Sequence, residues 1–168
     1  MMISDFIKKE DCRSCRFCCV FRRKSLWEVP KHQKYIKDKY PTGFDGKPVR
    51  YREFDTPSGS WVITDLSDKY KTDDPEEAAP CPFLDPDGGC TLPNEDKPFE
   101  CKAWPLRYMR MPDGGLKVTL TPTCPAPHLK DTAALKKKSR DSWEQAFKDY
   151  ADSNPYIINE YRDGYIIL

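Results

Sequence analysis

Residues 12–19 read CRSCRFCC and decide how this chain is interpreted, because they place four cysteines within eight positions. Two residues separate each of the first three cysteines from the next, and at this spacing a turn or a helix start can direct successive sulfur atoms toward one point. A single C-x-x-C pair is common, but four further cysteines follow this run. The pattern therefore indicates thiolate ligation of a metal. The candidate ligands are Cys12, Cys15, Cys18, Cys19, Cys81, Cys90, Cys101 and Cys124.

The expected compartment decides whether these cysteines form disulfides or bind metal. The first residues, MMISDFIKKEDC, lack the basic stretch, long apolar run and small-residue cleavage site of a secretory signal. No apolar stretch approaches the roughly 20 residues that span a bilayer. We therefore expect a cytoplasmic protein that does not cross a membrane. Because cytosolic proteins rarely keep disulfides, metal ligation is the better explanation of the cysteines.

The bulk composition predicts a single domain with a thin hydrophobic core. The chain has 168 residues, a net charge of +1, a hydrophobic fraction of 38% and a mean hydropathy of −0.78. Its four Trp, nine Tyr and eight Phe nevertheless favour a packed fold. The near-neutral charge makes no strong case for binding nucleic acid or a membrane. A domain with so few apolar residues usually needs a disulfide, a metal or a partner for stability.

The first half of the chain predicts one helix and one hairpin. Residues 26–40 form a basic amphipathic stretch, with Pro30 suited to a first helical turn. Residues 49–54 and 60–66 alternate as strands do and flank the turn sequence DTPSG, so they predict a β-hairpin. Residues 67–80 are acidic, contain proline and predict a surface loop between the two groups of cysteines.

The second half predicts an α+β arrangement of short hairpins that ends in a helical extension over residues 131–168. Residues 85–89, DPDGG, form a turn that can bring Cys81 and Cys90 together. A short helix is expected at 97–104, and a hairpin at 106–121 through PDGG. Residues 131–150 predict an amphipathic helix whose apolar face packs in the core. The tail, 156–168, leaves a hairpin and a helix followed by a strand both open. Residues sharing the helix face are Leu135, Ser139, Trp143, Ala146, Phe147 and Tyr150.

The ligand type alone does not identify the metal, because thiolates suit both zinc and iron. A C-x2-C-x2-C run with a remote Cys-Pro is the bacterial ferredoxin pattern, and Cys81-Pro82 and Cys124-Pro125 both offer such a ligand. Two zinc sites, one cluster with one zinc, and one cluster with spare thiols all remain open. Adjacent side chains tend to point apart, so we expect Cys18 to join Cys12 and Cys15, while Cys19 faces elsewhere. His32 and His128 are weaker candidates.

The spacing of these residues resembles the YkgJ-like cysteine-cluster family, which is described as a zinc- or iron-chelating domain. The matching residues are the run 12–19, then CPFL at 81–84, Cys90, and KPFECKAWP at 97–105. The family has Arg, Arg and Phe where this chain has Lys97, Lys102 and Trp104, and Pro93 stands in place of a frequent Tyr. A lysine methylase of flagellin is similar to the same group. The resemblance implies metal chelation and says little about the biochemical role.

Three functions follow from these observations. The first is a cysteine-ligated zinc or iron protein, with the iron either mononuclear or in an iron–sulfur cluster. The second is a cluster-dependent enzyme, either a protein lysine methylase or an oxidoreductase, although no cofactor loop or catalytic motif is recognisable. The third is a zinc-finger-like adaptor that binds a protein, or nucleic acid through the basic residues of 13–52.

Overall fold

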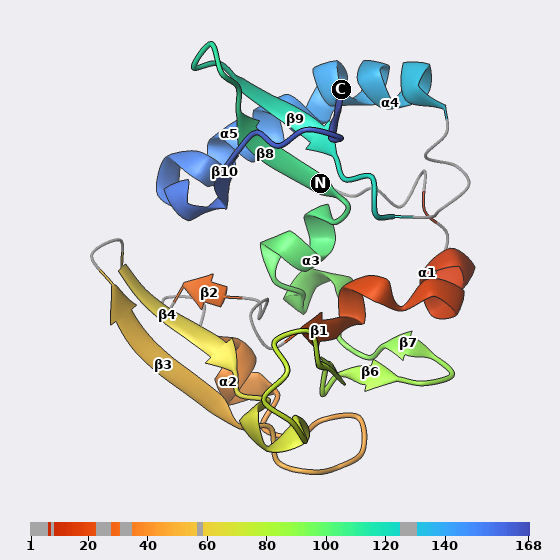
Figure 1. Ribbon diagram of the computed structural model, residues 1–168, viewed down its shortest axis with the longest axis vertical. Coiled ribbons are helices and arrows are strands. Elements are labelled where there is room, and N and C mark those ends of the chain that lie inside the picture. The colour runs from red at the N-terminus through yellow and green to blue at the C-terminus, as the bar shows by residue number, and fades with distance from the viewer. Residues whose placement is uncertain (1–6, 8, 23–27, 31–34, 57–58, 125–130) are drawn as a thin grey trace. The chain divides into compact units, whose positions relative to one another are not determined.

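The computed structural model describes residues 7, 9–22, 28–30, 35–56, 59–124 and 131–168, and it combines helices with several small β-sheets. The chain divides into two compact units. Unit 1 comprises Met1–Cys15 and Phe99–Leu168, and unit 2 comprises Arg16–Pro98 (Figure 1). The predicted α+β class, with small sheets and a C-terminal helix, is confirmed. The single-domain organisation stays a prediction.

The hairpin predicted from residues 49–66 forms the main sheet of unit 2. Strands β3 (Tyr51–Thr56) and β4 (Gly59–Thr64) pair antiparallel, with Phe54 opposite Trp61. Strand β2 (Glu28–Pro30) pairs with the other side of β4, so the strand order is β2-β4-β3. The alternating residues and the turn sequence between them are local signals, which is why this hairpin could be predicted.

The helix predicted over residues 26–40 is wrong. Residues 28–30 form strand β2, and the helix α2 covers only Tyr35–Lys39. Residues 26, 27 and 31–34 lie outside the described part of the chain. Val29 precedes Pro30, and the residue before a proline is disfavoured in the helical conformation and favoured in the extended one. Because β2 lies at the edge of its sheet, it can include a proline without breaking a central ladder.

The acidic stretch 67–80 is only partly the loop that we expected. It begins with a 3-10 turn, η3 (Ser67–Lys69), and its last residues form strand β5 (Ala78–Pro80), which pairs antiparallel with β1 (Val20–Arg22). Between them, the Glu77 carboxylate accepts hydrogen bonds from the backbone N–H groups of Lys71 and Thr72, at 2.6 and 2.8 Å. Through the pairing of β5 with β1, the end of this stretch therefore lies beside the first group of cysteines and leads directly into the second.

The rest of unit 2 is built from short turns over two small apolar clusters. Strands β6 (Leu84–Asp85) and β7 (Gly89–Cys90) form a hairpin, as the turn sequence 85–89 predicted, and η4 (Asn94–Asp96) follows. Gly89 has a φ of 86°, which a residue with a side chain rarely adopts. One cluster contains three buried residues and the other contains two. Their members are Phe21, Leu66 and Ala79, and Phe83 and Leu92.

Unit 1 contains a four-stranded sheet around the second predicted hairpin. Strands β8 (Leu106–Arg110) and β9 (Leu116–Leu120) pair antiparallel, as expected. The tail adds β10 (Ile158–Glu160) parallel to β8 and β11 (Ile166–Ile167) antiparallel to β9, so the order is β10-β8-β9-β11. The tail thus supplies both edge strands, an arrangement that matches neither alternative left open by the sequence. The unit also contains the short helices α1 (Lys9–Cys15) and α3 (Phe99–Ala103).

The predicted C-terminal helix is confirmed and covers residues 132–153. It consists of α4 (Thr132–Lys138), one π-helical segment (Ser139–Trp143) and α5 (Glu144–Ser153). The Asp131 carboxylate caps its start by accepting the N–H of Ala134 at 3.1 Å. The 3-10 turn η7 (Pro155–Ile157) then leads into β10.

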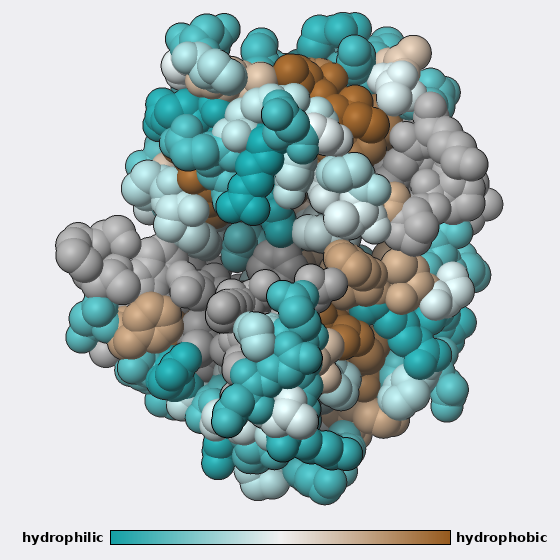
Figure 2. All heavy atoms as spheres, in the orientation of Figure 1, coloured by the Kyte–Doolittle hydropathy of each residue, from teal (hydrophilic) through white to brown (hydrophobic). Residues whose placement is uncertain are grey.

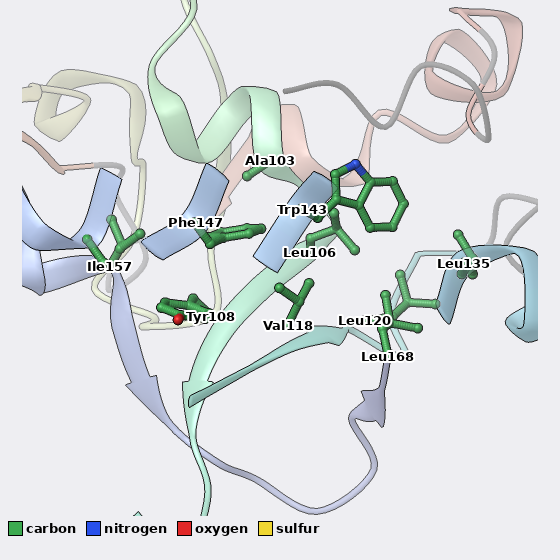
Figure 3. Close-up of a cluster of buried hydrophobic side chains, with 11 residues drawn as sticks. Ala103, Leu106, Tyr108, Val118, Leu120, Leu135, Trp143, Phe147, Ile157 and Leu168 are labelled. Carbon is green, nitrogen blue, oxygen red and sulfur yellow. The ribbon is translucent and has the colours of Figure 1, made fainter. Parts of the chain in front are cut away.

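The apolar face of this helix packs against the sheet to form the core of unit 1. Phe147 lies edge-to-face with Phe99 and stacks near Tyr108, with ring centroids 5.4 and 5.5 Å apart. Figure 3 shows Phe147 and Trp143 of the helix gathered with side chains of β8 and β9. The buried cluster contains Ala103, Leu106, Tyr108, Val118, Leu120, Leu135, Trp143, Phe147, Ala151, Ile157 and Leu168.

The surface agrees with the low mean hydropathy of −0.78. On the face shown in Figure 2, hydrophilic residues predominate among the coloured atoms, and hydrophobic ones form only small patches. Within the described residues, the helices are too short and too polar for any of them to cross a bilayer.

Candidate metal centre

The eight cysteines all lie in the described ranges, none of them forms a disulfide, and they divide equally between the two units. The division falls inside the C-x-x-C-x-x-C-C run, between Cys15 and Arg16. Arg16 has a φ of 53°, a left-handed conformation, at the point where α1 ends and the 3-10 turn η1 (Phe17–Cys19) begins. Unit 1 contains Cys12, Cys15, Cys101 and Cys124, and unit 2 contains Cys18, Cys19, Cys81 and Cys90.

Pairing of β1 with β5 brings Cys19 to Cys81, although 62 positions separate them in the sequence. Val20 lies opposite Pro80, and one position further along the ladder the Cys81 N–H donates to the Cys19 carbonyl at 2.8 Å. The acidic stretch therefore separates the two cysteine groups along the sequence but not in three dimensions. The loop returns the chain so that the second group begins beside the end of the first.

A turn at Cys81 and the β6–β7 hairpin that follows it bring Cys81 and Cys90 near each other. The Leu84 N–H donates to the Cys81 carbonyl at 3.0 Å, and Leu84 is the strand partner of Cys90. The ladder continues past the hairpin, because the Thr91 N–H donates to the Phe83 carbonyl at 2.8 Å. Both cysteines pack against the cluster of Phe83 and Leu92.

The sulfur atoms of these two cysteines each accept a backbone hydrogen bond from the residue two positions later. The donors are the N–H groups of Phe83, for Cys81, and Leu92, for Cys90. Hydrogen bonds to sulfur stabilise the thiolate form and orient a metal-ligating cysteine. This repeated hydrogen bond is the feature that most distinguishes these residues from cysteines that are simply buried.

Cys19 is the most acidic thiol for which the structure shows a shift. A hydrogen bond from the Cys18 thiol, together with the charge of Lys97, outweighs burial and lowers the pKa of Cys19 from 9.0 to about 7. The expectation that Cys18 and Cys19 point apart is wrong, since their side chains share this hydrogen bond. The two residues belong to a tight 3-10 turn, η1, and not to a strand, in which neighbours face opposite sides.

Burial has the opposite effect on the thiols of Cys81 and Cys90, also in unit 2. It raises the pKa of Cys81 to about 12, against the effect of the Phe83 N–H, and it raises the pKa of Cys90 as well. The charge of Cys19 adds to both increases, so the sulfurs lie close enough to repel one another when ionised. A bound cation would relieve this repulsion, because metal ligation replaces the thiol protons.

The four cysteines of unit 2 supply sulfur donors suited to a metal ion, but their side chains do not form a complete coordination site. Within the part of the chain that the structure describes, no three His, Cys, Asp or Glu side chains are grouped closely enough to hold a metal ion as they stand. The predicted joining of Cys12, Cys15 and Cys18 is not shown. Cys12, Cys15 and Cys101 are exposed, whereas Cys124 packs against the core of unit 1. His32 and His128 lie outside the described residues.

We predict that alkylation of Cys19 in the metal-free protein follows a titration with a midpoint near pH 7. Because the pKa is lowered, the reactive thiolate predominates above this pH and is lost below it. Mass spectrometry of peptides labelled with iodoacetamide over a range from about pH 5 to about pH 11, roughly two units below the lower and above the higher of the two candidate midpoints, measures the midpoint. Cys18→Ala removes the hydrogen-bond donor and should move the midpoint upward. An unshifted midpoint of 9.0 in the wild type would contradict the described contact.

We predict that Gly43→Ala distorts the Cys81 turn. A Cβ atom at Gly43 would lie 2.7 Å from the Pro82 carbonyl oxygen, which already accepts the Phe44 N–H at 2.8 Å. Neither backbone segment can rotate away as a flexible side chain would, so the expected loss of stability is about 1–3 kcal/mol. Urea denaturation measures it, and Thr42→Ala, at the exposed neighbouring position, should change stability by less than about 0.5 kcal/mol.

Some contributors to this centre were missed from the sequence. They are the backbone N–H groups of Phe83 and Leu92 and the ammonium group of Lys97. A signal for the first two exists, because both cysteines are followed two positions later by a large apolar residue that can anchor a turn. Comparison of the chain with family models, with curated proteins and with solved structures gives no match, so the resemblance to the YkgJ-like proteins stays a prediction.

Proposed function

We propose that Cys18, Cys19, Cys81 and Cys90 together bind zinc or iron, the iron either mononuclear or in an iron–sulfur cluster, and that this metal stabilises unit 2. The observation that carries the proposal is the approach of Cys19 to Cys81 at the β1–β5 ladder, next to the β6–β7 hairpin that carries Cys90. Cys19 acts electrostatically on both Cys81 and Cys90, and the last two sulfurs accept backbone N–H groups. Four thiolates form a complete ligand set for a soft metal ion.

Ligation requires the four side chains to turn their sulfurs toward one ion. Zinc–sulfur bonds are about 2.3 Å long, so rotations about χ1 must close the present arrangement. The backbone hydrogen bonds around Cys81 and Cys90 hold the Cys81 turn and the β6–β7 hairpin in place during such rotations. These four residues hold the metal, and the neighbouring N–H groups and Lys97 stabilise the negative charge of its ligands.

A bound metal would also add to the free energy of unfolding of unit 2, which has little buried apolar surface. Its described buried clusters contain three and two residues, which is little apolar burial for a segment of this length. Structural zinc contributes about 10–16 kcal/mol in small peptides at neutral pH. Cys12, Cys15, Cys101 and Cys124 share unit 1 and stay candidate ligands for a second thiolate site.

Metal analysis with a UV–visible spectrum, on protein purified without air, tests the proposal. Iron with sulfide and broad visible absorption would identify an iron–sulfur protein, whereas zinc with no visible absorption would identify a structural zinc site. Cys90→Ser should remove the metal of unit 2, and Cys101→Ser, in unit 1, should leave it bound. A folded wild-type protein that contains no metal and takes up none would contradict the proposal.

The enzyme and adaptor hypotheses stay predictions. The basic segment 13–52 includes residues 23–27 and 31–34, which lie outside the described part of the chain. Calorimetry with S-adenosylmethionine tests the methylase hypothesis. Salt-dependent binding to DNA or RNA tests the adaptor hypothesis, because contacts with phosphates release counterions.

A further inference from the structure

Cys19 and Cys81 lie opposite each other at the end of a β-ladder. Val20 of β1 pairs with Pro80 of β5, and the next hydrogen bond of the ladder runs from the Cys81 N–H to the Cys19 carbonyl at 2.8 Å. Opposite residues that share such a bond in an antiparallel pair have Cα atoms about 5.5 Å apart. This separation lies within the range of about 4.4–6.8 Å that a disulfide bridges.

The other two cysteines of unit 2 are not placed opposite either residue. Cys18 lies inside the 3-10 turn η1, outside the ladder, and Cys90 pairs with Leu84. Cys19 and Cys81 are both free thiols that are only partly buried, so a small oxidant can reach them. They are therefore the two thiols of this unit whose backbones the described hydrogen bonds hold face to face.

The strands that carry the two cysteines are held together by packing. Phe21 of β1 pairs with Ala79 of β5, and both belong to a buried cluster against which Cys81 also packs. Because 62 positions separate Cys19 from Cys81, a disulfide between them would close a long loop. Such a crosslink strongly restricts the unfolded chain and would keep β1 and β5 paired.

We propose that Cys19 and Cys81 are a redox pair that forms a reversible disulfide across the end of the β1–β5 ladder. A small disulfide, such as oxidised glutathione, is the oxidant. One cysteine sulfur attacks it, forms a mixed disulfide and releases one glutathione, and the other cysteine then attacks the mixed disulfide and releases the second. The cysteine pair loses two electrons and two protons, and the two glutathione thiols gain them.

This disulfide goes beyond the proposed metal binding and would oppose it. A metal ligand must be a thiolate, so oxidation would leave only Cys18 and Cys90 of the four proposed ligands. Two ligands do not complete a tetrahedral site. Oxidation should therefore release the metal, and reduction should allow it to bind again. The release rests on the proposed function, whereas the disulfide itself rests on the ladder geometry.

Oxidation of the purified protein with mixtures of reduced and oxidised glutathione tests the pair. Free thiols are then alkylated, and linked peptides are identified by mass spectrometry. We expect a loss of two free thiols per chain and a link between Cys19 and Cys81 that a reductant removes. Cys18 shares a tryptic peptide with Cys19, so two variants identify the linked residue. The link should persist in Cys18→Ser and disappear in Cys19→Ser.

The same oxidation in urea is the matched control, because the unfolded chain should favour links between cysteines that are close in sequence. Absence of the Cys19–Cys81 link from the native protein would overturn the inference, as would an equal yield in urea or persistence of the link in Cys19→Ser. A chromogenic chelator measures zinc released during oxidation. A protein that forms the link but contains no metal, or keeps its metal when linked, would overturn the proposed function and leave the redox pair standing.

Discussion

Removal of the proposed metal is expected to unfold unit 2 while unit 1 keeps its structure. The apolar clusters of unit 2 are small, whereas unit 1 has one continuous cluster that includes Phe147 and Trp143. A structural metal worth about 10–16 kcal/mol is comparable with the whole stability of a domain, about 5–15 kcal/mol. Hydrogen exchange after chelation measures the effect. Amides of β4, the central strand of the β2-β4-β3 sheet, should lose protection, and those of β8 and β9 should retain it.

Addition of zinc to the chelated protein is the control for this experiment, because it should restore the protection of β4. Cys81→Ser should behave as the chelated protein does, with or without added zinc. Retention of protection by β4 without metal would contradict a structural role for the metal. Simultaneous loss of protection by β4, β8 and β9 would contradict independent stability of the units and would support the single domain expected from the sequence.

Phe147→Ala is expected to destabilise unit 1 by about 3–5 kcal/mol. Phe147 is 2% exposed, and its ring contacts those of Phe99 and Tyr108 at the centre of the helix–sheet core. Truncation would remove both ring contacts and leave a cavity that the surrounding strands cannot close. Urea denaturation followed by circular dichroism measures the loss, and stoichiometry of bound metal in unit 2 should not change.

Lys148→Ala provides the matched control, because it truncates the next side chain of the same helix at an exposed position. It should change the free energy of unfolding by less than about 0.5 kcal/mol. A loss below about 1 kcal/mol in Phe147→Ala would show that this helix does not supply the main core. A loss of metal in Phe147→Ala would contradict the assignment of the centre to unit 2.

Elements with strong local signals could be predicted. Alternation and turn residues identified both hairpins, and the apolar face identified the C-terminal helix. The donor chemistry was likewise evident, because cysteine identity and spacing are properties of the sequence alone. In each case the deciding interactions lie within a few residues along the chain.

Elements that depend on a distant partner could not be predicted. Residues 28–30 became a strand because β4 supplies hydrogen-bonding partners for them, and the residue before Pro30 avoids the helical conformation. The tail paired with two different edges of one sheet, which no pattern within residues 156–168 specifies. The unpaired N–H and C=O groups of an edge strand can form hydrogen bonds with any extended segment that lies beside them. Such pairings therefore depend on the fold of the whole chain.

The sequence by itself determined that this protein carries eight thiols, in a spacing that predicts metal binding, together with two hairpins and a C-terminal helix. Only the tertiary structure decided which cysteines lie near one another. The left-handed turn at Arg16 and the pairing of β1 with β5 divide the C-x-x-C-x-x-C-C run and place Cys19 beside Cys81. The physical reason is that the spacing of cysteines along the sequence determines only how sulfurs of one short segment can approach one another. Which cysteine of a distant segment lies beside them depends on strand pairing.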